Sequence, residues 1–175
     1  FQVVVVIDQE AANDGAVIRK RAAVDIIAVC ESLTIDIQTL QFEKLDYGET
    51  EVLDRFYSAD AAIIDFSVHS QQNSLIYHMG VRESMDQKSN LLIYNISKHK
   101  AEGDGKLCAP FKKTFASYEW ILYYEDRPDK PLLVIDPSLV SLAVTSTTEL
   151  LDPLPITKFS STVKTFLTDV QVDAR

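Results

Sequence analysis

Short apolar runs recur along the chain at nearly regular intervals, and this rhythm limits the folds that the chain can adopt. The runs begin near Val3, Ile35, Ala61 and Leu91, at steps of 32, 26 and 30 residues. A step of about thirty residues is the length of one strand and one helix, the repeating unit of parallel sheets with right-handed crossovers. The first run, from Val3 to Ile7, is entirely β-branched, which is typical of a strand buried on both faces. We therefore expect a mainly parallel sheet whose first strand is central. Its parallel strands are expected near residues 3–7, 35–41, 61–66 and 91–95.

Helical patterns fill the intervals between these runs. Ile18, Ala22, Ile26 and Val29 follow one another at spacings of three or four, which predicts a helix over residues 17–32. Further helices are expected at residues 49–57, 74–87 and about 158–170. Two later strands, at residues 120–124 and 132–135, are separated by a short polar link and could form an antiparallel hairpin.

These elements together predict one α/β regulatory domain over residues 1–175, with a Rossmann-like (flavodoxin-like) three-layer sandwich. The alternative is a thioredoxin-like fold, in which the hairpin lies at the edge of a smaller sheet. Met85 is expected to face inward together with Leu75 and Met79. One common core is expected to contain Phe56, Ile63, Ile64, Leu75, Met79, Leu92 and Ile93.

Charge and hydropathy narrow the classes of function. The chain carries 17 basic and 26 acidic residues, for a net charge of −9, and this balance opposes binding to nucleic acid. No apolar run approaches the roughly 18 residues that a membrane helix needs, so no membrane association is expected. The start has no signal-peptide pattern and no Met, which suggests a fragment of a longer protein. The two cysteines lie far apart and indicate no disulfide framework, so a cytoplasmic location is expected. His69, His78 and His99 lack the spacing of metal ligands, so no metal site is expected.

Residues 45–94 contain two distinctive strings. LDYGETEVLDRFYSAD begins at Leu45, and SLIYHMGVRES begins at Ser74. Both closely resemble the amino-terminal, thioredoxin-binding region of the apoptosis-signal-regulating family of MAP kinase kinase kinases, as a divergent, invertebrate member would. The resemblance implies a stress-responsive regulatory domain that binds thioredoxin and other domains of its parent kinase. It also implies that the parent is a cytoplasmic Ser/Thr kinase using ATP and magnesium in apoptosis signalling. The domain itself, which has no catalytic signature, is expected to be no enzyme and to need no cofactor.

The same segment also resembles nucleoside deoxyribosyltransferases and related Rossmann-like N-glycosidases. Those enzymes place a nucleophilic Glu two residues before a Gly that corresponds to Gly80, but this chain has His78 at that position. An imidazole cannot replace the carboxylate nucleophile, so the resemblance predicts a pocket that has lost its catalytic activity. The alternatives are an active N-glycosidase, a passive structural module, or simple packing of Tyr77 and His78. The predicted pseudo-active pocket consists of Asp8, Asp65, Ser67, Tyr77, His78, Arg82 and Glu83.

The two cysteines, Cys30 and Cys108, are the candidate redox thiols. Cys30 lies within the first predicted helix and is expected to be buried, since free cysteine is among the most buried residue types. Cys108 follows a glycine-containing loop and is expected to be the more exposed of the two. The related kinases carry a further cysteine just before the last helix, and residues 150–156 of this chain contain none. The resemblance therefore does not imply that thioredoxin binds this chain through a cysteine thiol.

Overall fold

The computed structural model describes residues 1–10, 15–96, 118–135 and 157–174. As far as Asn95, strands alternate with helical segments, as the apolar rhythm predicts. In chain order the elements are β1 (Gln2–Val6), α1 (Ala16–Ser32), β2 (Asp36–Leu40), α2 (Phe42–Tyr47), α3 (Thr50–Ser58), β3 (Ala61–Asp65), the 3-10 turn η1 (His69–Gln71), α4 (Gln72–Ser84), β4 (Asn90–Asn95), β5 (Glu119–Tyr124), β6 (Leu133–Ile135), β7 (Thr157–Lys158) and α8 (Phe159–Asp173).

One sheet joins the described strands in the order β2-β1-β3-β4-β5-β6-β7. The first five are parallel, and β6 and β7 are added antiparallel at one edge. The parallel part has the strand order of flavodoxin-like folds, which confirms the predicted Rossmann-like sandwich over the smaller thioredoxin-like sheet. The antiparallel hairpin of β5 and β6 is also confirmed. The first strand is interior, between β2 and β3, but the middle position of the sheet belongs to β4 rather than β1.

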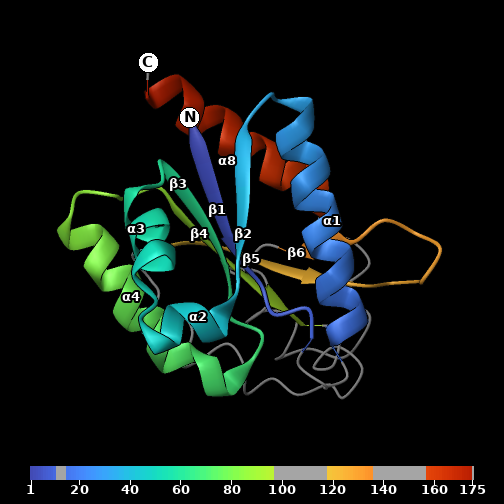
Figure 1. Ribbon diagram of the computed structural model, residues 1–175. Coiled ribbons are helices and arrows are strands. Elements are labelled where there is room, and N and C mark those ends of the chain that lie inside the picture. The colour runs from blue at the N-terminus through green and yellow to red at the C-terminus, as the bar shows by residue number, and fades with distance from the viewer. Residues whose placement is uncertain (11–14, 97–117, 136–156, 175) are drawn as a thin grey trace.

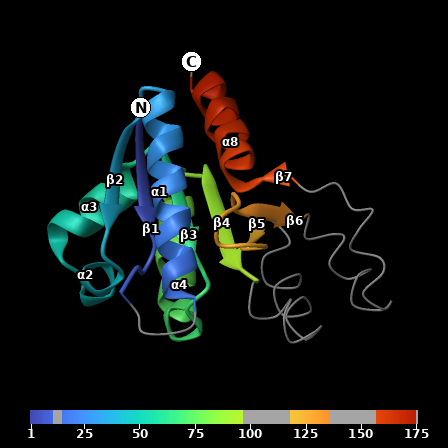
Figure 2. The same ribbon diagram turned by 90° about the vertical axis from the view of Figure 1, so that its right-hand side faces the viewer.

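Helices cover both faces of the sheet, as Figures 1 and 2 show: α1 and α8 on one face, and α2, α3 and α4 on the other. The prediction of one common core is wrong, because there are two. Ile63 and Ile93 pack towards α1 and α8, whereas Ile64 and Leu92 pack towards α2, α3 and α4. Successive side chains of a strand point to opposite faces, so neighbours such as Ile63 and Ile64 must enter different cores.

Two helices differ from the sequence prediction. α2 was not predicted, because its six residues are too few to display a helical period, and it ends where Gly48 adopts a left-handed conformation with φ of 84°. α4 begins two residues earlier than expected and ends at Ser84. Met85 lies beyond that end and is 56% exposed, so the prediction that it faces inward is wrong. Among the described helices, none is long and apolar enough to cross a membrane.

Candidate functional site

Three of the predicted pocket residues lie where the sheet's connections change direction. Asp8 follows β1, Asp65 ends β3, and Ser67 follows two residues later. β1 and β3 are neighbours, but the chain leaves β1 towards the β2 edge and leaves β3 towards β4. In open sheets of this kind, ligands bind in the crevice that this divergence creates at the carboxyl ends of the strands.

Asp65 is the most deeply buried carboxylate of this region, with 3% of its surface exposed. One of its oxygens accepts a hydrogen bond from the Tyr123 hydroxyl at 2.5 Å, and the other accepts one from the Ser67 backbone N–H at 2.6 Å. Burial raises the pKa of Asp65, although these hydrogen bonds and the charge of Arg19 oppose the rise. Burial also raises the pKa of Tyr123, and the neighbouring Asp65 adds to that shift. The pair is therefore a desolvated acid and hydroxyl that hold one another in place.

Asp8 is held from three directions. Gln71 donates from its side-chain amide to one carboxylate oxygen at 2.7 Å, and the Glu10 backbone N–H donates to the other at 2.9 Å. The Asp8 carbonyl accepts a hydrogen bond from Nε of Arg19 at 2.6 Å, and Arg19 is only 1% exposed. These contacts fix the end of β1 against α1 and η1. We call this set the switch-point cluster: Asp8, Arg19, Asp65, Ser67, Gln71 and Tyr123.

Sequence reasoning missed three members of this cluster. Arg19 stands three residues before Ala22 and seven before Ile26, so it lies on the buried face of α1, and helical spacing could have identified it. Tyr123 lies two residues after Ile121 on β5, and both side chains face the same core. The two-residue period of a strand could therefore have identified Tyr123 as buried. Gln71 lies on the three-residue turn η1 and gave no comparable signal.

Tyr77 and His78 lie on α4, away from the switch-point cluster. His78 is buried and packs against α3, where its Nδ1 and the Tyr57 hydroxyl share a hydrogen bond of 2.6 Å. Burial lowers the pKa of His78, and the charge of Asp46 partly opposes this. Tyr77 packs edge-on against the His78 ring but remains 67% exposed.

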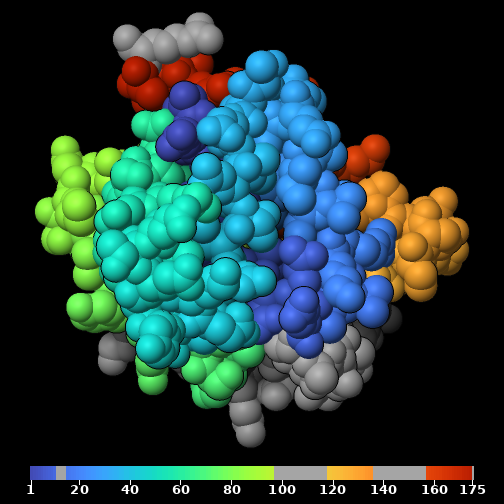
Figure 3. Space-filling model, in the orientation of Figure 1, coloured from blue at the N-terminus to red at the C-terminus, as the bar shows by residue number. Residues whose placement is uncertain are grey.

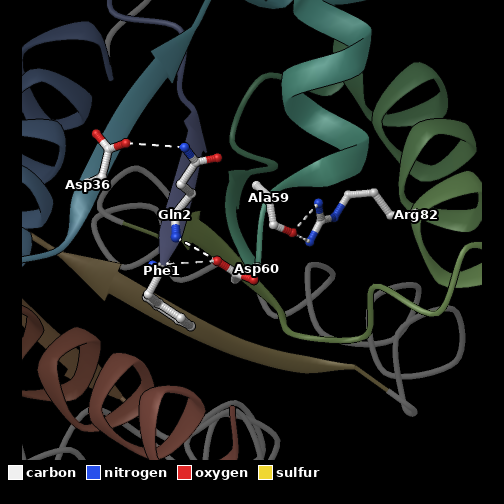
Figure 4. A network of polar contacts seen from close by, with 6 residues as sticks. All are labelled: Phe1, Gln2, Asp36, Ala59, Asp60 and Arg82. Carbon is white, nitrogen blue, oxygen red and sulfur yellow. Dashed lines mark hydrogen bonds and ion pairs between the residues drawn. The ribbon is translucent and has the colours of Figure 1, made fainter. Parts of the chain in front are cut away.

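Arg82 lies at the opposite, amino-terminal edge of the sheet and is completely buried. Its Nε donates to the side chain of Asn90 at 2.8 Å, and its two terminal nitrogens donate to the Ala59 carbonyl at 3.2 Å. It also donates to the carbonyl of Phe56 and stacks over that ring. Figure 4 shows Arg82 reaching Ala59 while the adjacent Asp60 accepts a hydrogen bond from the Gln2 backbone. Arg82 thus ties α3 and the segment before β3 to the start of β4, and burial lowers the pKa of Arg82 to about 10.

The seven predicted residues therefore do not form one pocket. Asp8, Asp65 and Ser67 gather at the carboxyl edge, whereas Arg82 and Glu83 stand at the amino edge. The reason is the length of α4, which starts after β3 and runs 13 residues, or roughly 20 Å, back along the sheet. Residues near its end cannot return to the crevice where the helix begins.

Comparisons with known proteins identify the family. A family model described as the deoxyribohydrolase (DRHyd) domain of the ASK signalosome matches residues 25–60. Mitogen-activated protein kinase kinase kinase nsy-1 of Caenorhabditis elegans is 38% identical over 136 residues, which cover 78% of this chain and 9% of that protein. The chain belongs to the ASK family of MAP kinase kinase kinases, as an amino-terminal domain.

Two further relatives agree with this assignment. Human mitogen-activated protein kinase kinase kinase 5 is 42% identical over 89 residues, 51% of this chain and 6% of that protein. Mouse mitogen-activated protein kinase kinase kinase 15 is 48% identical over 69 residues, 39% of this chain and 5% of that protein. The chain spans less than a tenth of the length of each of these relatives.

The ASK-family domain also has an open groove of about 520 Å³ at the amino edge, where α4 ends and α8 passes. Four carboxylates and one cation, Lys88, line it, together with the apolar Phe166 and Val170. Burial raises the pKa of Glu119 there, and the nearby Asp169 contributes. Among the residues that the structure describes, no group of His, Cys, Asp or Glu could hold a metal ion. The four carboxylates that line the groove belong to Glu83, Glu119, Asp169 and Asp173.

Cys30 is fully buried in the core beneath α1. Burial raises its pKa to about 11, so the thiol remains protonated near neutral pH and is a poor nucleophile. Cys108 lies outside the described residues. Of the two candidate redox thiols, the one that the structure describes is therefore shielded from partners.

Proposed function

We propose that this chain is a redox- and stress-responsive interaction domain of a cytoplasmic MAP kinase kinase kinase, and that it docks thioredoxin. The observation that carries the proposal is its 38% identity to nsy-1 over most of its length, since that protein is named as a MAP kinase kinase kinase. The parent would be a Ser/Thr kinase that uses ATP and magnesium in a catalytic domain outside this chain. Reduced thioredoxin and other domains of the parent would hold the kinase inactive until oxidation releases it.

The geometry of this chain favours docking by surface shape over capture by a thiol. Cys30 is buried in a core that a partner cannot reach without unfolding α1. A specific interface of ordinary size buries roughly 1,200–2,000 Å² in total and needs no covalent bond. Redox dependence would then come from thioredoxin, whose own state changes the surface that it offers.

Calorimetric titration of the purified domain with reduced and with oxidised thioredoxin tests this proposal. We expect saturable binding of the reduced form and weaker binding of the oxidised form. Absence of binding by both forms, with a domain that is folded by circular dichroism, would reject thioredoxin as a partner. Equal binding of both forms would reject the redox control.

A second candidate is a nucleoside-related pocket, favoured by the deoxyribohydrolase description of the matching family and by the buried switch-point cluster. We expect it to lack hydrolase activity. The position that needs a carboxylate nucleophile is His78, and its ring is engaged with Tyr57 rather than with the crevice.

Incubation of the domain with each common 2′-deoxyribonucleoside and its monophosphate, followed by chromatography of the free base, tests this expectation. We expect no base above the level seen without protein. Base release that disappears in the Asp65→Asn variant would show that the switch-point cluster is an active site.

A further inference from the structure

Tyr47 is the most exposed aromatic residue among those that the structure describes, with 91% of its surface accessible. Within the part of the chain that the structure describes, its ring and hydroxyl make no hydrogen bond and no ring contact. Tyrosine usually buries most of its ring, so a ring fully in water contributes nothing to the core. The fold therefore gives no reason for an aromatic residue at this position.

The backbone around Tyr47 forms a protruding corner between α2 and α3. All six residues from Asp46 to Glu51 are exposed. Gly48 turns the chain with φ of 84°, and α2 has only six residues with a single buried side chain, Leu45. In Figure 3, α2 and α3 lie on the surface that faces the viewer. A short helix that ends at such a turn opens at low free-energy cost, because few contacts are lost.

The corner is also strongly acidic. Asp46 directly precedes Tyr47, and Glu49 and Glu51 follow within four residues, although Glu51 forms an ion pair with Arg55 of α3. Lys44 is the one basic residue between positions 43 and 51, which also include Glu43. A negative segment of this kind complements an enzyme cleft lined with Lys and Arg.

We propose that Tyr47 is the acceptor site of an acid-directed protein tyrosine kinase. In the transfer, the phenol oxygen of Tyr47 attacks the γ-phosphorus of Mg·ATP in the kinase, and the bond to the β–γ bridging oxygen breaks. ADP leaves, and the phenol proton passes to the catalytic carboxylate of the kinase. The product places about two further negative charges on the α2–α3 corner, which changes what that corner can bind. This proposal does not depend on thioredoxin binding.

The other six tyrosines are poor acceptors for structural reasons. Tyr94, Tyr123 and Tyr124 are buried strand residues. Tyr57 shares a hydrogen bond with His78, and Tyr118 donates one to Glu83 at 3.1 Å. Tyr77 is 67% exposed, but it lies in the middle of the 13-residue α4, between Leu75 and the buried His78 and Met79. A kinase cleft would have to unwind that helix, so Tyr77 is the matched control.

Phosphorylation of the whole domain by a panel of acid-directed tyrosine kinases with Mg·ATP tests the proposal, with site mapping by mass spectrometry. A synthetic peptide of residues 41–53 serves to select the active kinases. Tyr47→Phe should reduce the initial rate of phosphate incorporation by about tenfold or more, whereas Tyr77→Phe should leave it within about twofold. Glu49→Gln should slow modification at Tyr47 without changing the melting temperature.

Three outcomes would overturn the proposal. The first is a folded domain that resists every kinase able to modify the peptide, since the corner would then be inaccessible. The second is a peptide that none of the kinases modifies, since the acidic segment would then not be a recognition sequence. The third is phosphate that maps to Tyr77 or that persists in Tyr47→Phe.

Discussion

Two buried charged residues, Asp65 and Arg82, lie at opposite edges of the sheet and have different kinds of hydrogen-bond partner. Asp65 at the carboxyl edge is held by one hydroxyl and one backbone N–H, while Arg82 at the amino edge satisfies carbonyls from two segments. Both are fully desolvated, and an unpaired buried group costs about 1–3 kcal/mol. The pairing of each is therefore a requirement of folding. His78 differs from both because the ordinary pKa of an imidazole lies near physiological pH, and burial lowers the pKa of this one.

Acidification should destabilise the domain through His78. Burial lowers the pKa of His78 in the folded state below its value of about 6.5 in the unfolded chain. Between these two values the unfolded chain binds more protons, so the free energy of unfolding falls as pH drops from about 6.5 through the folded pKa. His78→Gln should show a smaller loss of urea stability between about pH 7.5 and pH 5.5 than the native chain. His69→Gln, which changes an exposed histidine, is the control, and an unchanged pH dependence in His78→Gln would contradict the prediction.

At the scale of elements, α4 shows how a sequence motif and a site can differ. The string from Tyr77 to Ser84 marks the family, yet its most buried member, Arg82, binds α3, the segment before β3 and the start of β4. The string therefore encodes the attachment of α4 to the sheet. Its arrangement could not be predicted from the sequence, because which carbonyls an arginine reaches depends on elements up to 26 residues away.

Replacing Arg82 should measure this attachment. Arg82→Met keeps most of the volume but leaves the Phe56 and Ala59 carbonyls without a donor, so the free energy of unfolding should fall by about 3 kcal/mol or more. The free energy of unfolding of Arg82→Lys should lie between those of the native chain and of Arg82→Met, since an ammonium group cannot reach all the acceptors that the guanidinium binds. The control is Arg55→Met on the exposed face of α3, where loss of the pair with Glu51 should cost less than about 1 kcal/mol. Urea denaturation gives these values, and equal losses at both positions would refute the assigned role.

The strands themselves were predictable, since β-branched runs indicate buried strands whatever their neighbours. Ile64 on β3 is completely buried against α3 and α4. Ile64→Ala should therefore lower the free energy of unfolding by about 2–5 kcal/mol. Val17→Ala on α1, where the side chain is 70% exposed, should change it by less than about 0.5 kcal/mol. An unchanged thermal melt for Ile64→Ala would show that β3 does not carry the core.

At the scale of the whole molecule, the sequence predicted the sheet and the helices that cover it better than it predicted the candidate functional site. The apolar rhythm gave the parallel sheet, because each βα unit is determined locally. The division into two cores follows from the alternation of side chains along each strand, which is a local pattern. The split of the seven polar residues depends instead on strand order and on the length of α4, which no local pattern contains. Local periodicity could have shown that Arg19 and Tyr123 are buried. Their meeting at one site could not be predicted, because α1 and β5 lie more than a hundred positions apart in the chain.

The last prediction concerns thioredoxin and the whole surface. Cys30 is buried with a pKa of about 11, Cys108 lies outside the described residues, and residues 150–156 carry no thiol. If docking by shape provides the affinity, the double variant Cys30→Ser, Cys108→Ser should bind thioredoxin within about tenfold of the native chain, or roughly 1.4 kcal/mol. Calorimetry measures this, and Cys30→Ser alone separates any effect on packing from an effect on binding. Complete loss of binding in Cys108→Ser, with an unchanged circular dichroism spectrum, would instead indicate a mixed disulfide, because only a covalent contact depends so fully on one sulfur.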